Sequence, residues 1–204
     1  MTDQKPTQLQ TISAYWCHYN SGELEDRYDW VLDALSEQIQ ALSDDAYFLI
    51  VSLAKSAPSE RCESFVAAGP LEDYVNEIVT KRRAGLAKRI IETRGLRELL
   101  PQAWGQSSKL EDLASGAADN ATPPAQPDSP LKMFDIKEIM GFWSSACVPS
   151  FVEDYQGDFN AVIDKLSSSS PDKREAMEDE LKASAPDDKA KEYLDIHIFS
   201  RYRH

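Results

Sequence analysis

Apolar residues that recur at steps of three and four over residues 24–42 constrain the fold of this chain more than any other feature. An α-helix has about 3.6 residues per turn, so side chains at this spacing share one face. The pattern predicts an amphipathic helix that starts after Ser21, a residue type favoured at helix N-caps. Its apolar stripe consists of Leu24, Tyr28, Val31, Leu32, Leu35, Ile39 and Leu42, and its acidic outer face includes Glu25, Asp26, Asp29, Asp33, Glu37 and Gln38.

Helical signals continue along the chain after this helix. Ser43 is a favourable N-cap, and Asp44 and Asp45 suit the first turn of a helix, where the dipole favours carboxylates. The following run "YFLIV" would also suit a strand, but it continues without a break into "SLAKSA", which favours a helix. We therefore predict an all-α fold. Residues 193–200 are left open between strand and helix, because their apolar residues alternate.

A change of composition divides the chain into two small helical units. Residues 106–131 are rich in Ala, Ser, Asp and Pro and hold only three Leu as large apolar residues. Such a segment buries too little surface to offset the entropy of ordering, so we predict a flexible linker. It separates an N-terminal helical domain, residues 7–105, from a C-terminal helical unit, residues 132–204. A compact bundle and a short stack of helical repeats are both compatible with this division.

The two units show an internal similarity. A shift of 127 to 128 residues brings Leu53 onto Leu181 and Pro58 onto Pro186, within segments whose residue types agree better than their identities. Helical stripes also align by chance. The similarity predicts that the C-terminal unit is a divergent copy of the first.

The stretch "FVAAGPLEDYV", residues 65–75, is predicted to be a corner between two helices. Gly69 can adopt the left-handed conformation that ends a helix, and Pro70 suits the first turn of the next one. Glu72 and Asp73 would then lie near a helix N-terminus, which favours carboxylates. A phosphate-binding loop would hold more glycines and no adjacent acids.

Residues 14–105 resemble a family of small bacterial helical domains of unknown function. The resemblance rests on "AYWCHY", "ELEDRYDWVLDAL", "FVAAGPLEDYV" and "LLPQAWG". Its most specific motif is "AAGPLEDYV", residues 67–75. The resemblance implies an all-helical domain and implies no activity.

The sequence offers no constellation of residues for catalysis. Cys17, Cys62 and Cys147 lack metal-ligand spacing and are expected to be reduced thiols. Cys17 and His18 are adjacent, so on a helix they point about 100° apart and do not form a nucleophile–base pair. No calcium-loop pattern is present among the acids. We predict a non-enzymatic protein with no catalytic residue, no cofactor and no metal.

Charge is distributed unevenly along the chain. The net charge is −13, yet residues 80–97 hold seven Lys or Arg against one acid. This basic segment lacks aromatic residues for base stacking, and the acidic remainder would repel nucleic acid, so nucleic-acid binding is not favoured. Its cations are expected to pair with acids within the fold or across a dimer. They are Lys81, Arg82, Arg83, Lys88, Arg89, Arg94 and Arg97.

The acidic residues predict a protein-binding module for a basic protein partner. The most concrete version is an immunity or antitoxin-type protein that neutralises a basic toxin or effector by direct binding. The alternatives are a scaffold, adaptor or regulatory domain of a bacterial system, and less favourably a nucleic-acid regulator using residues 81–97. No apolar run is long enough to span a membrane, so a cytoplasmic location is expected, and homodimer formation is left open. The predicted contact residues are Glu23, Glu25, Asp26, Asp29, Asp33, Asp44, Asp45, Glu72 and Asp73.

Overall fold

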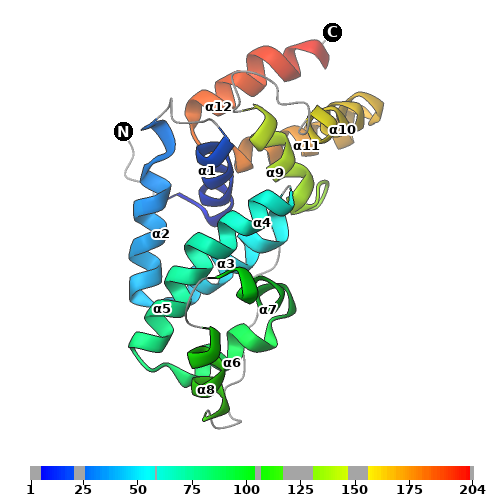
Figure 1. Ribbon diagram of the computed structural model, residues 1–204. Helices are drawn as coiled ribbons and strands as arrows, with labels where there is room; N and C mark the ends of the chain where they lie inside the picture. Colours follow the sequence, from blue (N-terminus) through cyan, green and yellow to red (C-terminus); the bar gives the residue numbers. More distant parts are fainter. Residues whose placement is uncertain are drawn as a thin grey trace. The chain divides into compact units, whose positions relative to one another are not determined.

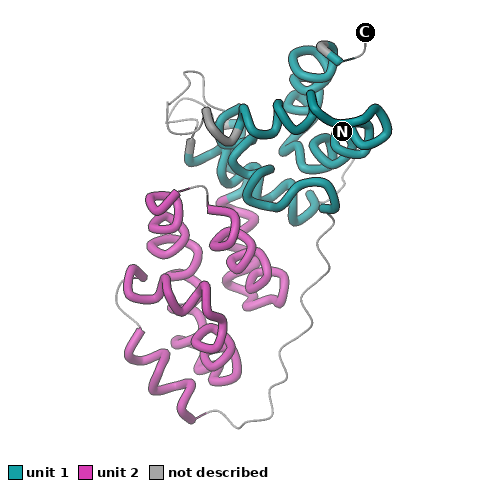
Figure 2. Tube along the Cα trace, turned by 90° about the vertical axis from the view of Figure 1, so that its right-hand side faces the viewer, with its two compact units in different colours: residues 1–31, 129–204 teal, residues 32–128 magenta. Residues whose placement is uncertain are grey.

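The computed structural model describes residues 6–20, 26–57, 59–103, 107–116, 131–146 and 156–202. All regular structure in these ranges is helical, which confirms the predicted all-α class (Figure 1). The chain divides into two compact units (Figure 2). Unit 1 combines residues 1–31 with 129–204, and unit 2 comprises residues 32–128. The predicted domain of residues 7–105 therefore coincides with neither unit.

Unit 1 is built around the first helix of the chain, which packs against helices from the C-terminal part. Helix α1 contacts both α9 and α11, and α9 contacts α10. These contacts explain why α1 belongs to this unit rather than to unit 2. The elements are α1 (Gln8–Asn20), η1 (Asp26–Tyr28), α9 (Ile136–Ala146), α10 (Gln156–Ser168), α11 (Pro171–Ser184), α12 (Asp188–Tyr193), η5 (Leu194–Ile198) and η6 (Phe199–Tyr202).

Aromatic side chains fill the core of unit 1. Trp16 on α1 and Phe142 on α9 are fully buried, and Trp143 is almost so. The indole Nε1 of Trp143 donates a hydrogen bond to Ser184 Oγ at 2.7 Å, which satisfies its buried N–H and ties α9 to α11. Cys17 on α1 is disulfide-bonded, so the expectation of a reduced thiol is wrong at this position.

Unit 2 surrounds the apolar helix α3. Ser43 caps this helix by accepting a hydrogen bond from the backbone N–H of Ala46 at 3.0 Å, as predicted. Helix α3 contacts α4 and α7, while α5, α6 and α8 contact one another. The elements are most of α2 (Trp30–Ala41), α3 (Asp44–Ser56), α4 (Glu60–Val66), η2 (Ala67–Leu71), α5 (Glu72–Thr80), α6 (Ala84–Glu92), α7 (Arg94–Leu99), η3 (Leu100–Gln102) and α8 (Ser107–Ser115).

The helix predicted over residues 24–42 is shorter in the structure. It begins at Trp30, directly after Asp29, a residue type favoured at N-caps. The start predicted at Ser21 lies outside the described residues. Leu32, which the pattern placed on the apolar stripe, is 36% exposed on α2. The buried stripe of this helix is therefore narrower than predicted.

Helix α8 lies within the predicted linker, residues 106–131. Its nine residues are helical and contact α5 and α6. Leu110 is fully buried in this contact, so one apolar residue anchors a segment whose composition indicated disorder. Residues 117–130 of the predicted linker lie outside the described ranges.

The prediction of a corner between two helices at Gly69–Pro70 is wrong, because the helix continues through these residues. Residues 67–71 form a π-helical turn between α4 and α5, in which the backbone N–H of Glu72 bonds to the carbonyl of Ala67. Gly69 has no left-handed φ angle. A π-helical turn is wider than an α-helical one, so the chain passes Pro70 without the sharp stop that the sequence indicated.

A second π-helical turn, η5, lies 127 residues after the first, at Leu194–Ile198. This turn resolves the open assignment of residues 193–200 in favour of helix. It contains no proline, so a turn of this kind does not in itself require one. In both places the turn follows a short helix, and that helix follows a longer one, so the element order recurs at the spacing of the internal similarity.

Candidate functional site

The acidic residues predicted to contact a partner are divided between the two units. Glu23 and Glu25 lie outside the described residues, and only the backbone of Asp26 is described, in η1. Asp29 belongs to unit 1. The remaining acids all belong to unit 2 and are Asp33, Asp44, Asp45, Glu72 and Asp73.

Asp29 already has a partner within its own unit. Its Oδ1 lies 3.1 Å from Nδ1 of His18 on α1. The Asp29 side chain is 55% exposed. This contact ties the residue before α2 to the first helix, so Asp29 has a structural role whether or not it also meets another protein.

Asp44 is committed to an ion pair with a buried arginine. Arg89 is only 8% exposed, and its Nη1 lies 2.8 Å from Asp44 Oδ1. The guanidinium carbon of Arg89 lies 3.4 Å from the centre of the Tyr47 ring, a cation–π contact. Removing one member of such a pair leaves a buried charge uncompensated, so Asp44 is foremost a structural residue. Its assignment as a partner contact stays a prediction, because its side chain is still 65% exposed.

The surroundings of Arg89 form a buried polar cluster with incomplete hydrogen bonding. Tyr47 Oη and Thr93 Oγ1 are 2.7 Å apart, so this hydroxyl pair is satisfied. Among the described residues, Tyr74 Oη and two nitrogens of Arg89, Nε and Nη2, have no hydrogen-bond partner. Burial raises the pKa of Tyr74 to about 12, although the Arg89 guanidinium acts in the opposite direction. The tyrosine is therefore neutral at physiological pH and holds no charge for chemistry.

Three carboxylates gather on α5, at Glu72, Asp73 and Glu77. Glu77 Oε2 pairs with Lys81 Nζ at 2.9 Å. Asp73 is exposed, and no cation of the described chain pairs with it. Partial desolvation raises the pKa of the Asp73 carboxyl, and the charges of Glu72 and Glu77 raise it further. We call these three residues the α5 acid cluster. The two neighbouring charges disfavour the ionised form of Asp73, which has no ion pair among the described residues.

Other predicted acids are exposed near the ends of neighbouring helices. Asp33 lies on the outer face of α2 and Asp45 in the first turn of α3. Neither forms an ion pair with any described residue. Glu37, one turn after Asp33, is exposed in the same way. These carboxylates are free to meet solvent or a partner.

The basic segment is largely neutralised within unit 2, as expected. Four of its seven cations form ion pairs with acids of the same unit: Lys81 with Glu77, Lys88 with Glu92, Arg89 with Asp44, and Arg94 with Glu98. Arg82, Arg83 and Arg97 form no ion pair with a described residue. This use of the cations weakens the nucleic-acid alternative, because most of the charge is already compensated.

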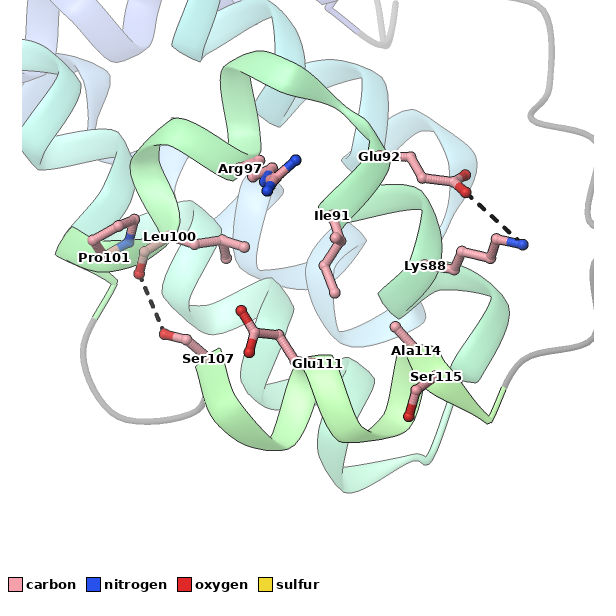
Figure 3. Close-up of a pocket in the computed structure, with 10 residues that line it drawn as sticks. All are labelled: Lys88, Ile91, Glu92, Arg97, Leu100, Pro101, Ser107, Glu111, Ala114 and Ser115. Carbon is pink, nitrogen blue, oxygen red and sulfur yellow. Dashed lines mark hydrogen bonds and ion pairs between the residues drawn. The ribbon is translucent and has the colours of Figure 1, made fainter.

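A pocket of about 660 Å³ opens between α6, α7 and α8 (Figure 3). Ile91 and Leu100 supply apolar surface near its centre, whereas Arg97 and Glu111 extend from α7 and α8. A second pocket of about 430 Å³ lies along the other side of α8 and includes Arg82. Residues of α8 line both pockets.

Two classes of feature are missing from the described ranges. No three His, Cys, Asp or Glu side chains there come close enough together to hold a metal ion. Among the described helices, none is both long and apolar enough to cross a membrane.

Comparison of the chain with protein-family models, with curated proteins and with solved structures gives no match. The resemblance of residues 14–105 to small bacterial helical domains therefore stays a prediction. The functional reading depends on the geometry of the chain itself.

Sequence reasoning missed two parts of this arrangement. Glu77 was not included with Glu72 and Asp73, although its spacing of four residues from Asp73 places both on one helix face. Glu111 was assigned to the linker. The three-residue spacing of Leu110 and Leu113 was a weak signal that this segment is helical.

Proposed function

We propose that the chain is a non-enzymatic module that binds a basic protein through the acidic surface of unit 2. The most concrete version is an immunity or antitoxin-type protein that neutralises a basic toxin or effector by direct binding. A cytoplasmic site of action goes with this proposal.

The observation that carries the proposal is the imbalance of charge on unit 2. Most cations of the basic segment are paired within the fold, whereas Asp33, Asp45 and Asp73 are exposed without ion pairs among the described residues. In the α5 acid cluster, desolvation raises the pKa of the Asp73 carboxyl, and repulsion by the charges of Glu72 and Glu77 raises it further. Lys or Arg side chains of a partner would relieve this repulsion, and such complementarity accelerates association and selects partners.

The direct test is a pulldown from the native host with three forms of the protein. The first is the wild type and the second is the E72Q/D73N variant of the α5 acid cluster. The third, D172N/E175Q, removes the same charge from exposed positions of α11 in unit 1. We expect the wild type and the α11 variant to capture a basic protein at low salt, and capture to fall sharply in about 0.5 M salt. The α5 variant should capture less of it.

Failure to recover a basic protein at either salt concentration would contradict the proposal. Recovery that depends on nucleic acid, judged by loss after nuclease treatment, would favour the nucleic-acid alternative instead. Expression of the captured protein with and without this chain then separates the two protein-binding versions. Growth inhibition that this chain relieves supports the immunity role, whereas a harmless partner supports a scaffold or adaptor.

A further inference from the structure

The pocket between α6, α7 and α8 presents two charges of opposite sign that the fold itself does not use. Arg97 comes from α7 and Glu111 from α8, and both side chains are exposed. Neither forms an ion pair or a hydrogen bond with another described residue. Figure 3 shows them on different sides of the opening, with Leu100 and Ile91 near its centre.

The remaining polar groups of the wall are already occupied. Lys88 Nζ lies 3.8 Å from Glu92 Oε1, so these two opposite charges lie beside each other at one end of the pocket and partly compensate. The Ser107 hydroxyl donates a hydrogen bond to the backbone carbonyl of Leu100 at 3.3 Å. The charges of the described wall that have no ion pair are therefore the Arg97 guanidinium and the Glu111 carboxylate.

The size and the floor of the pocket suit a small molecule. Its volume of about 660 Å³ lies within the usual range of small-ligand sites, roughly 300–1,000 Å³. Leu100 is buried and Ile91 is half-buried, so the apolar side chain of a ligand held by the two charges would meet apolar surface. Such a floor with a few charged groups is the common composition of binding pockets.

The pair of charges restricts the chemistry of the ligand. An anion alone would face the Glu111 carboxylate as well as Arg97, and a cation alone would face the Arg97 guanidinium. We infer that this pocket binds a small zwitterion with an apolar side chain, namely an amino acid or a short peptide. Its carboxylate would pair with Arg97, whose planar donors suit a bidentate contact, and its ammonium group with Glu111.

The test is a titration of the ¹⁵N-labelled full chain followed by NMR. The zwitterionic probes are L-leucine and glycyl-leucine. The matched controls are 4-methylpentanoate and 3-methylbutylamine, which keep the apolar skeleton of leucine and lack the ammonium group or the carboxylate. We expect saturable shifts of amides in residues 88–115 with a zwitterionic probe, and at least about tenfold weaker binding of each single-charge control.

Two variants assign the binding to the pocket charges. R97Q and E111Q should each weaken binding of the zwitterionic probe by at least about tenfold. R94Q and E98Q, on the same stretch of chain as Arg97, alter a surface ion pair outside the pocket and should leave the affinity unchanged. Thermal unfolding verifies that each variant is folded, and E111Q carries the test if R97Q is not.

Three results would overturn the inference. They are the absence of saturable shifts with both zwitterions, equal binding of a single-charge control, and unchanged affinity in a folded R97Q or E111Q variant. None of these results bears on the α5 acid cluster, so this inference and the proposed function stand or fall separately.

Discussion

At the scale of single residues, the buried hydroxyls of Tyr74 and Tyr47 should differ in how much they stabilise the fold. Its ring is fully buried, and its hydroxyl has no partner among the described residues. Tyr74→Phe should therefore change the free energy of unfolding by less than about 1 kcal/mol at neutral pH. Tyr47→Phe removes a hydroxyl that pairs with Thr93 and should cost about 1 kcal/mol. Urea unfolding of both variants compares the two values.

Ionisation of Tyr74 should also lower the stability of the protein at alkaline pH. Because burial raises the pKa of Tyr74 from 10.0 to about 12, the unfolded chain ionises first. The stability that this residue gives the wild type is complete below pH 10 and falls as the pH rises towards 12. The Tyr74→Phe variant should lack this part of the loss. Parallel losses in the two proteins would show that the hydroxyl is not responsible.

The Asp73 carboxylate is expected to lower the stability of the fold slightly while it contributes to binding of the partner. Its pKa is raised in the folded state, so its contribution to stability is complete below its unfolded pKa and falls as the pH rises through its folded pKa. Asp73→Asn should consequently stabilise the protein slightly at pH 7, by less than about 1 kcal/mol because solvent screens the exposed charges. The gain should vanish in acid. A variant that is less stable than the wild type at pH 7 would show that the carboxylate makes a favourable contact in the fold.

At the scale of helices, α8 depends on one anchor. Leu110 is its only fully buried side chain, and truncation of a buried leucine to alanine costs about 2–5 kcal/mol in a packed core. Leu110→Ala should therefore release α8 locally, which amide hydrogen exchange over residues 107–115 would detect as faster exchange. Leu113→Ala, at a half-buried position of the same helix, should have a smaller effect. Equal exchange in both variants and the wild type would mean that other contacts hold α8.

The same scale shows what the sequence could predict and what it could not. Apolar spacing and caps identified α3 with its Ser43 cap, because these signals are local. The π-helical turn at residues 67–71 was predicted as a helix break, because Gly and Pro usually end a helix where they occur together, as at Gly69 and Pro70. Packing on both sides of the turn overrides that local preference. Helix α8 was missed because one buried leucine outweighs a linker-like composition.

For the site, the individual acids were visible in the sequence but their roles were not. Asp44 and Asp73 are both in or next to the first turn of a helix, and only the fold shows that Asp44 is paired with a buried arginine. The pairing of Arg89 depends on contacts between residues 45 positions apart. Local spacing carries no information at that range.

At the scale of the whole molecule, the order of helical elements recurs along the chain, yet one of the two units is built from two separate stretches of sequence. The two π-helical turns lie 127 residues apart, and similar helices precede both. A duplication predicts this recurrence. The contacts of α1 with α9 and α11 nevertheless bring the first helix of the chain into the unit of the C-terminal part. The units defined by tertiary contacts, residues 1–31 with 129–204 and residues 32–128, therefore differ from the division near residue 106 that composition suggested.

Counting the free thiols of the chain tests whether Cys17 is disulfide-bonded. Cys17 is disulfide-bonded and Cys62 is a free, buried thiol, while Cys147 lies outside the described residues. Thiol counting in denatured protein should find fewer reactive thiols before reduction than the three expected after it. Three thiols before reduction would contradict the bond. Structural disulfides are uncommon in reducing compartments, so its presence in protein isolated from the host would count against a cytoplasmic location.

The central claim is that carboxylates of unit 2 bind a basic protein, and the salt dependence of the dissociation constant tests it most directly. The captured partner would be titrated against the wild type, E72Q/D73N and D172N/E175Q over a series of salt concentrations. We predict that affinity falls steeply with salt for the wild type and for the α11 control, and less steeply, from a weaker starting value, for the α5 variant. Identical affinities and slopes for all three proteins would contradict the account.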